Sequence, residues 1–274
     1  MEGNVSSESR YKSSAFDIIT LFKSFFHQSI AIIVFLLIWE AAPRIGLVNI
    51  LFISPPSVVF TSMMNLILSG ELIHQTISSL IRVSTGFGLA LLVALPLGFL
   101  LGGWFKGFET SVNPLLQILG QANPFTLFPV FMALLGIGEI SKIAIIYWVC
   151  QWPVLFNTIT GIKNVDPLLV KVARTAGLSK LEMFWKVLLP ASLPTVFTGI
   201  RMGAAFAFFM LIGAEMIGAH SGLGFMIIQA QATFQIPKMY AGIVTVALLG
   251  IVINYVMLGL EKRSMKWKED IVIG

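Results

Sequence analysis

The hydrophobic residues of this chain gather in six long windows separated by shorter polar stretches. A helix needs about 20 mostly apolar residues to cross a bilayer, because its backbone polar groups must be satisfied within the segment. Windows that meet this requirement cover residues 28–47, 77–103, 111–136, 141–161, 191–217 and 238–260. The pattern therefore predicts an all-α membrane protein of about six transmembrane helices, with residues 28–260 forming the membrane domain.

Composition points to lipid as the solvent. Of 274 residues, 57% are apolar and only 11% are charged, and the mean hydropathy is +0.89. This is too little polar surface to cover a soluble globule. The lone Cys150 excludes an intramolecular disulfide framework, and a net charge of +5 is small for a nucleic-acid-binding protein. We expect a lipid bilayer around the chain and no nucleic-acid partner.

The loop lysines and arginines predict the orientation, because cytoplasmic loops keep an excess of them. With both termini inside, thirteen fall on the cytoplasmic side and three, Arg44, Lys142 and Lys238, fall outside. We therefore predict a multi-pass inner-membrane protein with residues 1–27 and 261–274 in the cytoplasm. Within the first of these segments, apolar residues at helical spacing fit either an interfacial helix or an extension of the first span.

The most polar internal stretch, residues 162–190, is predicted to form two short amphipathic helices hinged at Gly177. Asp166 stands before a proline, and that pair favours a helix start. Gly177 suits a left-handed C-terminal cap, and Ser179 can cap the second helix, which Pro190 and Pro194 should limit. An alternative is an ordinary amphipathic loop on the membrane surface.

This loop resembles the EAA loop of bacterial ABC importer permeases. That signature has Glu-Ala-Ala, three residues, a glycine, about nine residues, and then an apolar pair with proline. The corresponding residues here are Lys171, Val172 and Ala173, then Gly177, then Leu188, Leu189 and Pro190. The resemblance implies that the contact with an ATPase subunit is made by Lys171, Ala173, Arg174, Gly177, Leu178 and Pro190. The first two positions differ from the family, which has Glu and Ala there.

Five more stretches extend the resemblance over nearly the whole chain, toward the nitrate, sulfonate, taurine and bicarbonate branch of binding-protein-dependent permeases. They are ISPPSVV at 53–59, SLIRVSTGF at 79–87, LLGIGEISKIAII at 134–146, FNTITGIKNVDP at 156–167 and AEMIGAHSGLGFMI at 214–227. QANPFTLFP at 121–129 departs from the branch, which usually carries two closely spaced prolines. Phe208 also departs, since tryptophan is common at that position.

The resemblance implies the type I ABC importer permease fold, with a homodimer of permeases, two ATPase subunits and an extracytoplasmic solute-binding protein. Its implied function is passage of a small solute, such as nitrate, bicarbonate or an organic sulfonate, by alternating access. The chain has no G-x-x-x-x-G-K-[ST] phosphate loop. We therefore expect no enzyme activity and no cofactor in this chain, with ATP and Mg bound by the partner.

Other functions remain open at this point. A permease of the same fold for another small organic solute, a secondary transporter, a channel and an intramembrane enzyme are the alternatives. A secondary transporter would usually show internal repeats and coupling acids in its spans, and neither is evident. His27, His74 and His220 are too scattered for a metal site.

Three charged residues within the predicted spans need an explanation, because intramembrane charges are costly. Arg201 and Glu215 share one helix but are fourteen residues apart, about 21 Å, so they cannot pair directly. Arg201 fits bonds to backbone carbonyls, snorkelling to the interface, or a part in anion passage. We interpret Glu215 and Arg82 as structural, and we expect the Glu215 carboxylate to accept from loop amides.

A softer polar set marks the candidate substrate pathway. Gln121 and Asn123 precede Pro124, where the helix must be interrupted, and irregular backbone at membrane depth normally lines protein or water. Gln151 and Trp152 likewise precede a proline. Free donors in a broken helix suit a small oxyanion, so we group these four with Arg201 as candidate pathway residues. Interhelical hydrogen bonds are the alternative.

Overall fold

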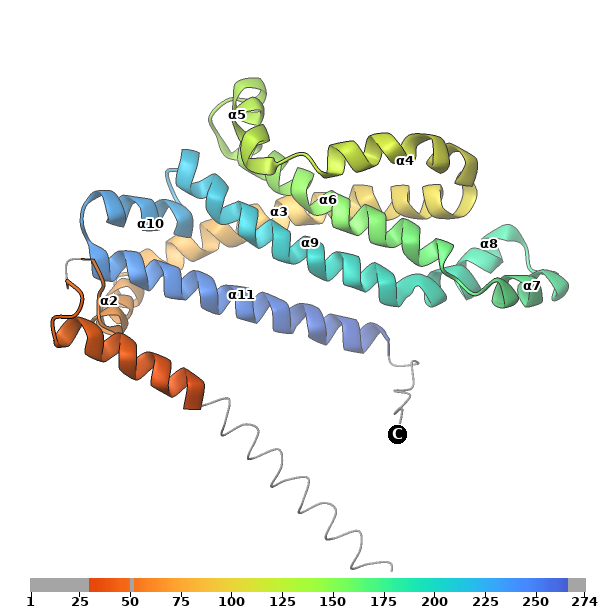
Figure 1. Ribbon diagram of the computed structural model, residues 1–274. Helices are drawn as coiled ribbons and strands as arrows, with labels where there is room; N and C mark the ends of the chain where they lie inside the picture. The colour runs from red at the N-terminus through yellow and green to blue at the C-terminus, as the bar shows by residue number, and fades with distance from the viewer. Residues whose placement is uncertain (1–29, 50–51, 266–274) are drawn as a thin grey trace, which may run out of the picture.

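The computed structural model describes residues 30–49 and 52–265, and within them every regular element is helical (Figure 1). The elements are a helix over 30–44, α2 (Pro56–Leu68), α3 (Glu71–Phe99), a π segment (Leu100–Trp104), α4 (Lys106–Gly120), α5 (Pro124–Leu135), α6 (Glu139–Lys163), α7 (Pro167–Thr175), α8 (Lys180–Met183), a second π segment (Phe184–Leu188), α9 (Leu189–Gly218), α10 (Leu223–Ala232) and α11 (Ile236–Ser264). The predicted all-α fold is confirmed.

Within the described residues, four helical stretches are long and apolar enough to cross a bilayer. They are Glu71–Trp104, Glu139–Lys163, Lys180–Gly218 and Ile236–Ser264. A fifth candidate consists of Gly107–Gly120 and Pro124–Leu135, joined at a bend of 91°. The first predicted span, 28–47, is helical over 30–44, and its beginning lies outside the described residues.

The predicted segments at the two termini fall largely outside the described part of the chain. Residues 1–29, with the candidate interfacial helix at 14–26, and residues 266–274 lie outside it. The first residues of the predicted C-terminal tail continue α11, which runs to Ser264.

The predicted interruption before Pro124 is confirmed as the break between α4 and α5. Proline has no N–H to donate and disfavours a helical conformation in the residue before it. Asn123 accordingly adopts an extended backbone, with φ −66° and ψ 119°, and begins α5 as its N-cap. The size of the bend was not predicted. Figure 1 shows α5 standing across the direction of α4 rather than continuing it.

The core of the bundle is α6, which packs mainly against α9 and α3. Small residues spaced four apart on α3, including Gly86, Ala90, Ala94 and Gly98, form a buried stripe. Such a stripe lets two helix backbones approach closely. At Gly98 the approach requires glycine, because an added Cβ would lie 2.6 Å from the Cβ of Thr158 on α6.

Short helices occupy the two ends of the bundle. Figure 1 shows α7 and α8 at one end, which we call the α7 end, and α2 and α10 at the opposite end, which we call the α10 end. A buried cluster joins α2, α3, α10 and α11 at the α10 end, and it consists of Val59, Leu66, Leu72, Leu223, Met226 and Ala241. The long helices thus connect two structurally distinct ends.

Candidate functional site

The first short helix of the 162–190 loop begins as its sequence predicts. The side chain of Asp166 caps α7, since its Oδ1 accepts a hydrogen bond from the backbone N–H of Leu168 at 2.7 Å. Pro167 occupies the first helical position, where a missing N–H costs nothing. Local chemistry therefore sets the point at which the chain leaves α6 and enters α7.

Gly177 ends α7 in the left-handed conformation that was predicted for it, with φ +74°. Its N–H donates to the carbonyl of Arg174 at 3.0 Å, and the N–H of Leu178 donates to the carbonyl of Ala173 at 3.2 Å. The second bond closes the six-residue ring of a Schellman cap. Ala173 is buried, so it packs one side of α7 against the protein.

Ser179 starts the second helix through a capping box, also as predicted. The N–H of Glu182 donates to Ser179 Oγ at 3.3 Å, and the Ser179 N–H donates to Glu182 Oε2 at 3.0 Å. The expectation that Pro190 and Pro194 limit this helix is wrong, since both lie within the continuous stretch Lys180–Gly218. The π segment Phe184–Leu188 precedes Pro190, and the helix runs on through α9 to Gly218. A π turn changes the hydrogen-bond spacing, which accommodates a proline that a regular helix interior would not.

The hairpin of α7 and α8 exposes an apolar surface. Leu168, Val172, Leu181 and Trp185 are 57–63% exposed. Exposed hydrophobic groups in a cluster indicate an interaction surface rather than a solvated face. Basic side chains lie on the same hairpin, because Lys171, Arg174 and Lys180 are all exposed. The hairpin therefore offers an apolar and positively charged surface at the α7 end.

An ion pair fixes the point where α6 meets this hairpin. Lys163, the last residue of α6, contacts Glu109 on α4, with Nζ 2.5 Å from Oε2. Glu109 is 1% exposed and also accepts from Asn113 at 2.6 Å. Sequence reasoning missed this pair, because its members are 54 residues apart. It ties the broken α4–α5 segment to the root of the hairpin.

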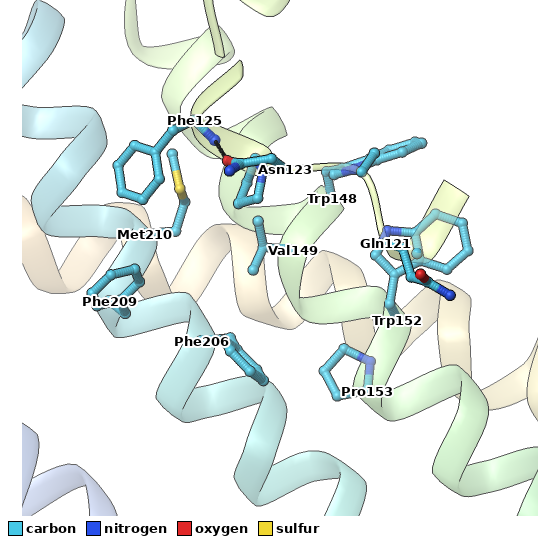
Figure 2. A pocket seen from close by; sticks show the side chains of 13 residues that line it. Gln121, Asn123, Phe125, Trp148, Val149, Trp152, Pro153, Phe206, Phe209 and Met210 are labelled. Atoms are coloured by element: carbon cyan, nitrogen blue, oxygen red, sulfur yellow. Dashed lines mark hydrogen bonds between the residues drawn. The ribbon is translucent and has the colours of Figure 1, made fainter. Parts of the chain in front are cut away.

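A cavity of about 440 Å³ lies where the α4–α5 break faces α6 and α9. Its lining residues come from the 120–125 segment, from Trp148, Val149, Trp152 and Pro153 on α6, and from Phe206, Phe209 and Met210 on α9. Figure 2 shows the aromatic side chains of α9 across from the indoles of α6, with Asn123 and Gln121 beside the indoles. The structure thus brings together Gln121, Asn123 and Trp152 of the candidate pathway set.

The polarity of Asn123 is set by its role as a helix cap. Its Oδ1 accepts from the N–H of Phe125 at 3.0 Å. The amide group then presents its Nδ2, which can only donate. Gln121 is exposed at the same cavity, and its side chain has no partner among the described residues. Both residues supply neutral polar groups to a cavity whose other walls are apolar.

The two indoles carry unpaired donors. Trp148 and Trp152 pack edge to face, with ring centroids 5.1 Å apart. Their Nε1 atoms are buried, and within the described residues neither has a hydrogen-bond partner. Sequence reasoning singled out Trp152 but missed Trp148. Its position one helical turn earlier on the same face was the signal that could have found it.

Gln151 and Arg201 are placed apart from this cavity. Among the described residues, those that line it include neither of them. Arg201 lines a smaller cavity of about 210 Å³ between α9 and α11. Its Nη1 lies 3.4 Å from Oε2 of Glu261, so an acid on α11 is its partner rather than Gln121 or Asn123. The grouping of Arg201 with the other four candidates therefore finds no support in the geometry.

Arg82 and Glu215 form the centre of a buried network at the α10 end. Arg82 Nη1 donates to Glu215 Oε1 at 2.7 Å, and Arg82 also donates to the carbonyl and the hydroxyl of Ser221. Glu215 accepts from the N–H of Gly224 at 2.9 Å and from Ser79 Oγ at 2.8 Å. Each buried charge therefore has an opposite charge and several hydrogen bonds, as a stable buried pair requires.

The network continues outward to the first turn of α6. Glu139 binds Arg82 through both carboxylate oxygens, with Nη2 2.9 Å from Oε1. Lys142 lies 3.0 Å from the same carboxylate and is only 2% exposed. It was counted above among the three basic residues of the outer loops, but it is a buried residue of α6. Sequence reasoning also missed Glu139 as a partner. These contacts hold α3, α6 and the α9–α10 loop together.

Known proteins resemble this chain over most of its length. Residues 45–266 match the family described as "Binding-protein-dependent transport system inner membrane component". The permease SsuC of Bacillus subtilis, named for aliphatic sulfonates transport, is 34% identical over 237 residues, 86% of each chain. The taurine transport system permease protein TauC of Escherichia coli is 27% identical over 243 residues, 87% of this chain and 88% of that protein.

Two further similarities come from a nitrate permease and a solved structure. The nitrate import permease protein NrtB of Synechocystis is 32% identical over 187 residues, 68% of each chain. A structure titled as an inward-facing conformation of the MetNI methionine ABC transporter matches with a TM-score of 0.60 at 18% identity, covering 68% of this chain and 92% of that one. At this identity the structural match establishes the fold alone.

Proposed function

Because the chain belongs to the family of binding-protein-dependent transport system inner membrane components, we propose that it passes a small oxyanion through the membrane by alternating access. Family membership makes it a multi-pass transport subunit of the inner membrane, and ATP hydrolysis lies in partner subunits. The proposal adds a second copy of this chain, ATPase subunits docked at the α7 end, and an extracytoplasmic binding protein at the α10 end.

The α7–α8 hairpin is the observation that carries this proposal. Its apolar residues Leu168, Val172 and Leu181 are exposed, although backbone hydrogen bonds and a capping box fix the hinge between the two helices. An amphipathic helix that lays its apolar face into a groove is a common mode of protein recognition. The ATPase subunit is the partner we assign to this face, with Lys171 and Arg174 giving electrostatic complementarity.

The other residues of the EAA-like motif set the shape of the hairpin at the proposed ATPase contact. Gly177 and Leu178 close the Schellman cap, Ala173 packs the inner side of α7, and Pro190 lies in the first turn of the long helix α9. Movement of the ATPase would therefore reach α9 directly, because the helix is continuous from Lys180 to Gly218. The ion pair of Lys163 with Glu109 gives a second connection, to α4.

The cavity at the α4–α5 break is proposed as part of the solute pathway. Non-helical backbone at membrane depth is tolerated only where it faces protein or water. The break at Gln121–Asn123 therefore needs a neighbour other than lipid, and a second copy of the chain across an aqueous pathway satisfies this need. Gln121, Asn123 and Trp152 line it with neutral polar groups.

Nitrate, bicarbonate and organic sulfonates are the solutes we favour. The relatives above are named for aliphatic sulfonates, taurine and nitrate, all of which present an oxyanion. The uncharged donors of the cavity suit an anion that must be bound weakly enough to leave. The runner-up is another small organic solute carried by the same fold.

The proposed orientation predicts which cysteines a membrane-impermeant maleimide can reach. Ser69 lies at the α10 end and Thr175 lies on α7, and both are exposed. The native Cys150 is fully buried, so it should give little background. We expect Ser69→Cys to be labelled in intact spheroplasts, and Thr175→Cys only after permeabilisation. Labelling of both without permeabilisation would refute the orientation.

Reconstitution of the chain with its ATPase subunits and cognate binding protein tests the function itself. Uptake of solute into vesicles should require all three components and ATP. Uptake or ATP hydrolysis by the chain alone would contradict the proposal that it is a subunit of an ATP-driven importer.

A further inference from the structure

We propose that the cavity between α5, α6 and α9 binds an organic oxyanion, with the anionic head on neutral hydrogen-bond donors and an apolar body on the aromatic wall. The inference rests on the proposed function, because it assumes that the cavity belongs to the solute pathway. It goes further by assigning Trp148 and Trp152 as donors and by choosing an organic anion over an inorganic one.

The size of the cavity favours an organic ligand. Cavities of about 300–1,000 Å³ are typical of sites for small organic molecules, and this one measures about 440 Å³. One water occupies about 30 Å³ of liquid. A four-atom ion such as nitrate would therefore leave most of the space unfilled, whereas a short aliphatic chain with an oxyanion head would occupy much more of it.

The polar donors of the cavity come from the break between α4 and α5 and from the neighbouring face of α6. Asn123 must present its Nδ2, because its Oδ1 is engaged by the N–H of Phe125. Asn123 also begins α5, a helix of 12 residues. The N-terminus of a helix carries partial positive charge and free N–H groups, which favour anions. Gln121 adds a second side-chain amide to the lining, beside the Trp152 indole (Figure 2).

The indole nitrogens complete the set of donors. Trp152 is 8% exposed, and its Nε1 has no partner among the described residues; the same holds for Nε1 of Trp148. An indole N–H can only donate, and a buried unpaired donor calls for an explanation. A bound oxyanion supplies acceptors alone. Because both nitrogens are shielded in this conformation, binding of the anion requires a local rearrangement around the two indoles.

The opposite side of the cavity can hold only an apolar group. Phe206, Phe209 and Met210 on α9 face the donors across the cavity, with Val149 between them (Figure 2). Among the described residues that line the cavity, none is charged. A cation therefore has no counter-charge here, whereas an amphipathic anion has a matching surface for each of its ends.

The test is direct binding of 4,4,4-trifluorobutane-1-sulfonate to the permease complex purified with its ATPase subunits, without the binding protein, followed by fluorine NMR. We expect saturable binding, and nitrate should compete at least about tenfold more weakly because it lacks the apolar body. Trp152→Phe keeps an aromatic ring, though a smaller one, and removes the donor, so affinity should fall about tenfold. Trp39→Phe, at a tryptophan of the 30–44 helix that packs against Tyr240 and does not line the cavity, is the matched control and should leave affinity unchanged.

A second variant protects the test against a folding defect at Trp152. Asn123→Asp keeps the helix cap, since aspartate is as good an N-cap as asparagine. It replaces the donor with a negative charge, so sulfonate binding should be lost. Asn123→Ser keeps the cap without adding a charge. Its affinity for the sulfonate should lie between that of the unmodified complex and that of Asn123→Asp.

The inference is overturned if the unmodified complex does not bind the sulfonate, or if either Trp152→Phe or Asn123→Asp binds it with unchanged affinity. The same preparations are assayed for ATP turnover stimulated by loaded binding protein. Stimulated turnover without sulfonate binding would contradict this inference and leave the importer function standing. Absence of stimulation in the unmodified complex would instead count against the proposed function.

Discussion

Replacing Gly177 with valine is expected to reduce binding-protein-stimulated ATP turnover about tenfold, while the variant reaches the membrane in near-normal amount. Gly177 has φ +74°, a conformation that costs an L-residue about 1–2 kcal/mol and that a β-branched residue rarely adopts. Apart from the two chain neighbours, no atom lies within 4 Å of an added Cβ, so the backbone conformation is the main source of strain. The strain therefore falls on the angle between α7 and α8, where we place the ATPase contact.

Gly177→Asn is the matched control for this experiment. Asparagine also adds a side chain at the hinge, but it tolerates the left-handed region. It should keep most of the stimulated turnover. Turnover in reconstituted vesicles and co-purification of the ATPase subunit are the measurements. Equal turnover for the valine variant and the unmodified complex would contradict a coupling role for the hairpin. The hairpin would then be a pair of helices on the membrane surface.

Arg82→Met should destabilise the protein by about 3–5 kcal/mol, because it leaves the Glu215 carboxylate buried without its cationic partner. Glu215 is 0% exposed, and Arg82 Nη1 lies 2.7 Å from its Oε1. We expect low yield from the membrane and a large fall in the apparent melting temperature in detergent. Lys186→Met, which breaks an exposed pair with Glu182, serves as the control and should change stability by less than about 1 kcal/mol.

The double variant Arg82→Met/Glu215→Gln separates loss of the charge pair from general damage. The glutamine side chain is neutral, so the double variant leaves no uncompensated charge from this pair in the protein. If the account is right, the double variant is more stable than Arg82→Met alone, as coupled neighbours require. Equal or greater damage in the double variant would show that Arg82 acts through contacts other than the Glu215 carboxylate.

The sequence predicted the hairpin well, because its chemistry is local. Asp166, Gly177 and Ser179 each act over two to five residues, and each makes the cap that its residue type favours. The expectation for Pro190 was wrong because it also rested on local sequence alone. A proline usually limits a helix, but a π segment just before it lets the helix continue into α9.

Contacts between distant segments could not be predicted in this way. The expected structural bond of Glu215 named loop amides but not Arg82, which lies 133 residues away in sequence. Pro124 predicted a break but not its angle, because the bend depends on how α5 packs against α6 and α9. The cavity therefore emerged only from the fold, which brought Trp148 and Phe209 to the residues of the break.

The most direct measurement of the central claim is solute uptake by vesicles that contain this chain and its ATPase subunits, with the ATPase subunits, the binding protein and ATP each omitted in turn. We expect uptake only when ATP is available to the ATPase subunits and loaded binding protein is present on the opposite side. We also expect that the chain alone neither hydrolyses ATP nor moves solute. Uptake by the chain alone, or uptake driven by an ion gradient without ATP, would contradict that claim.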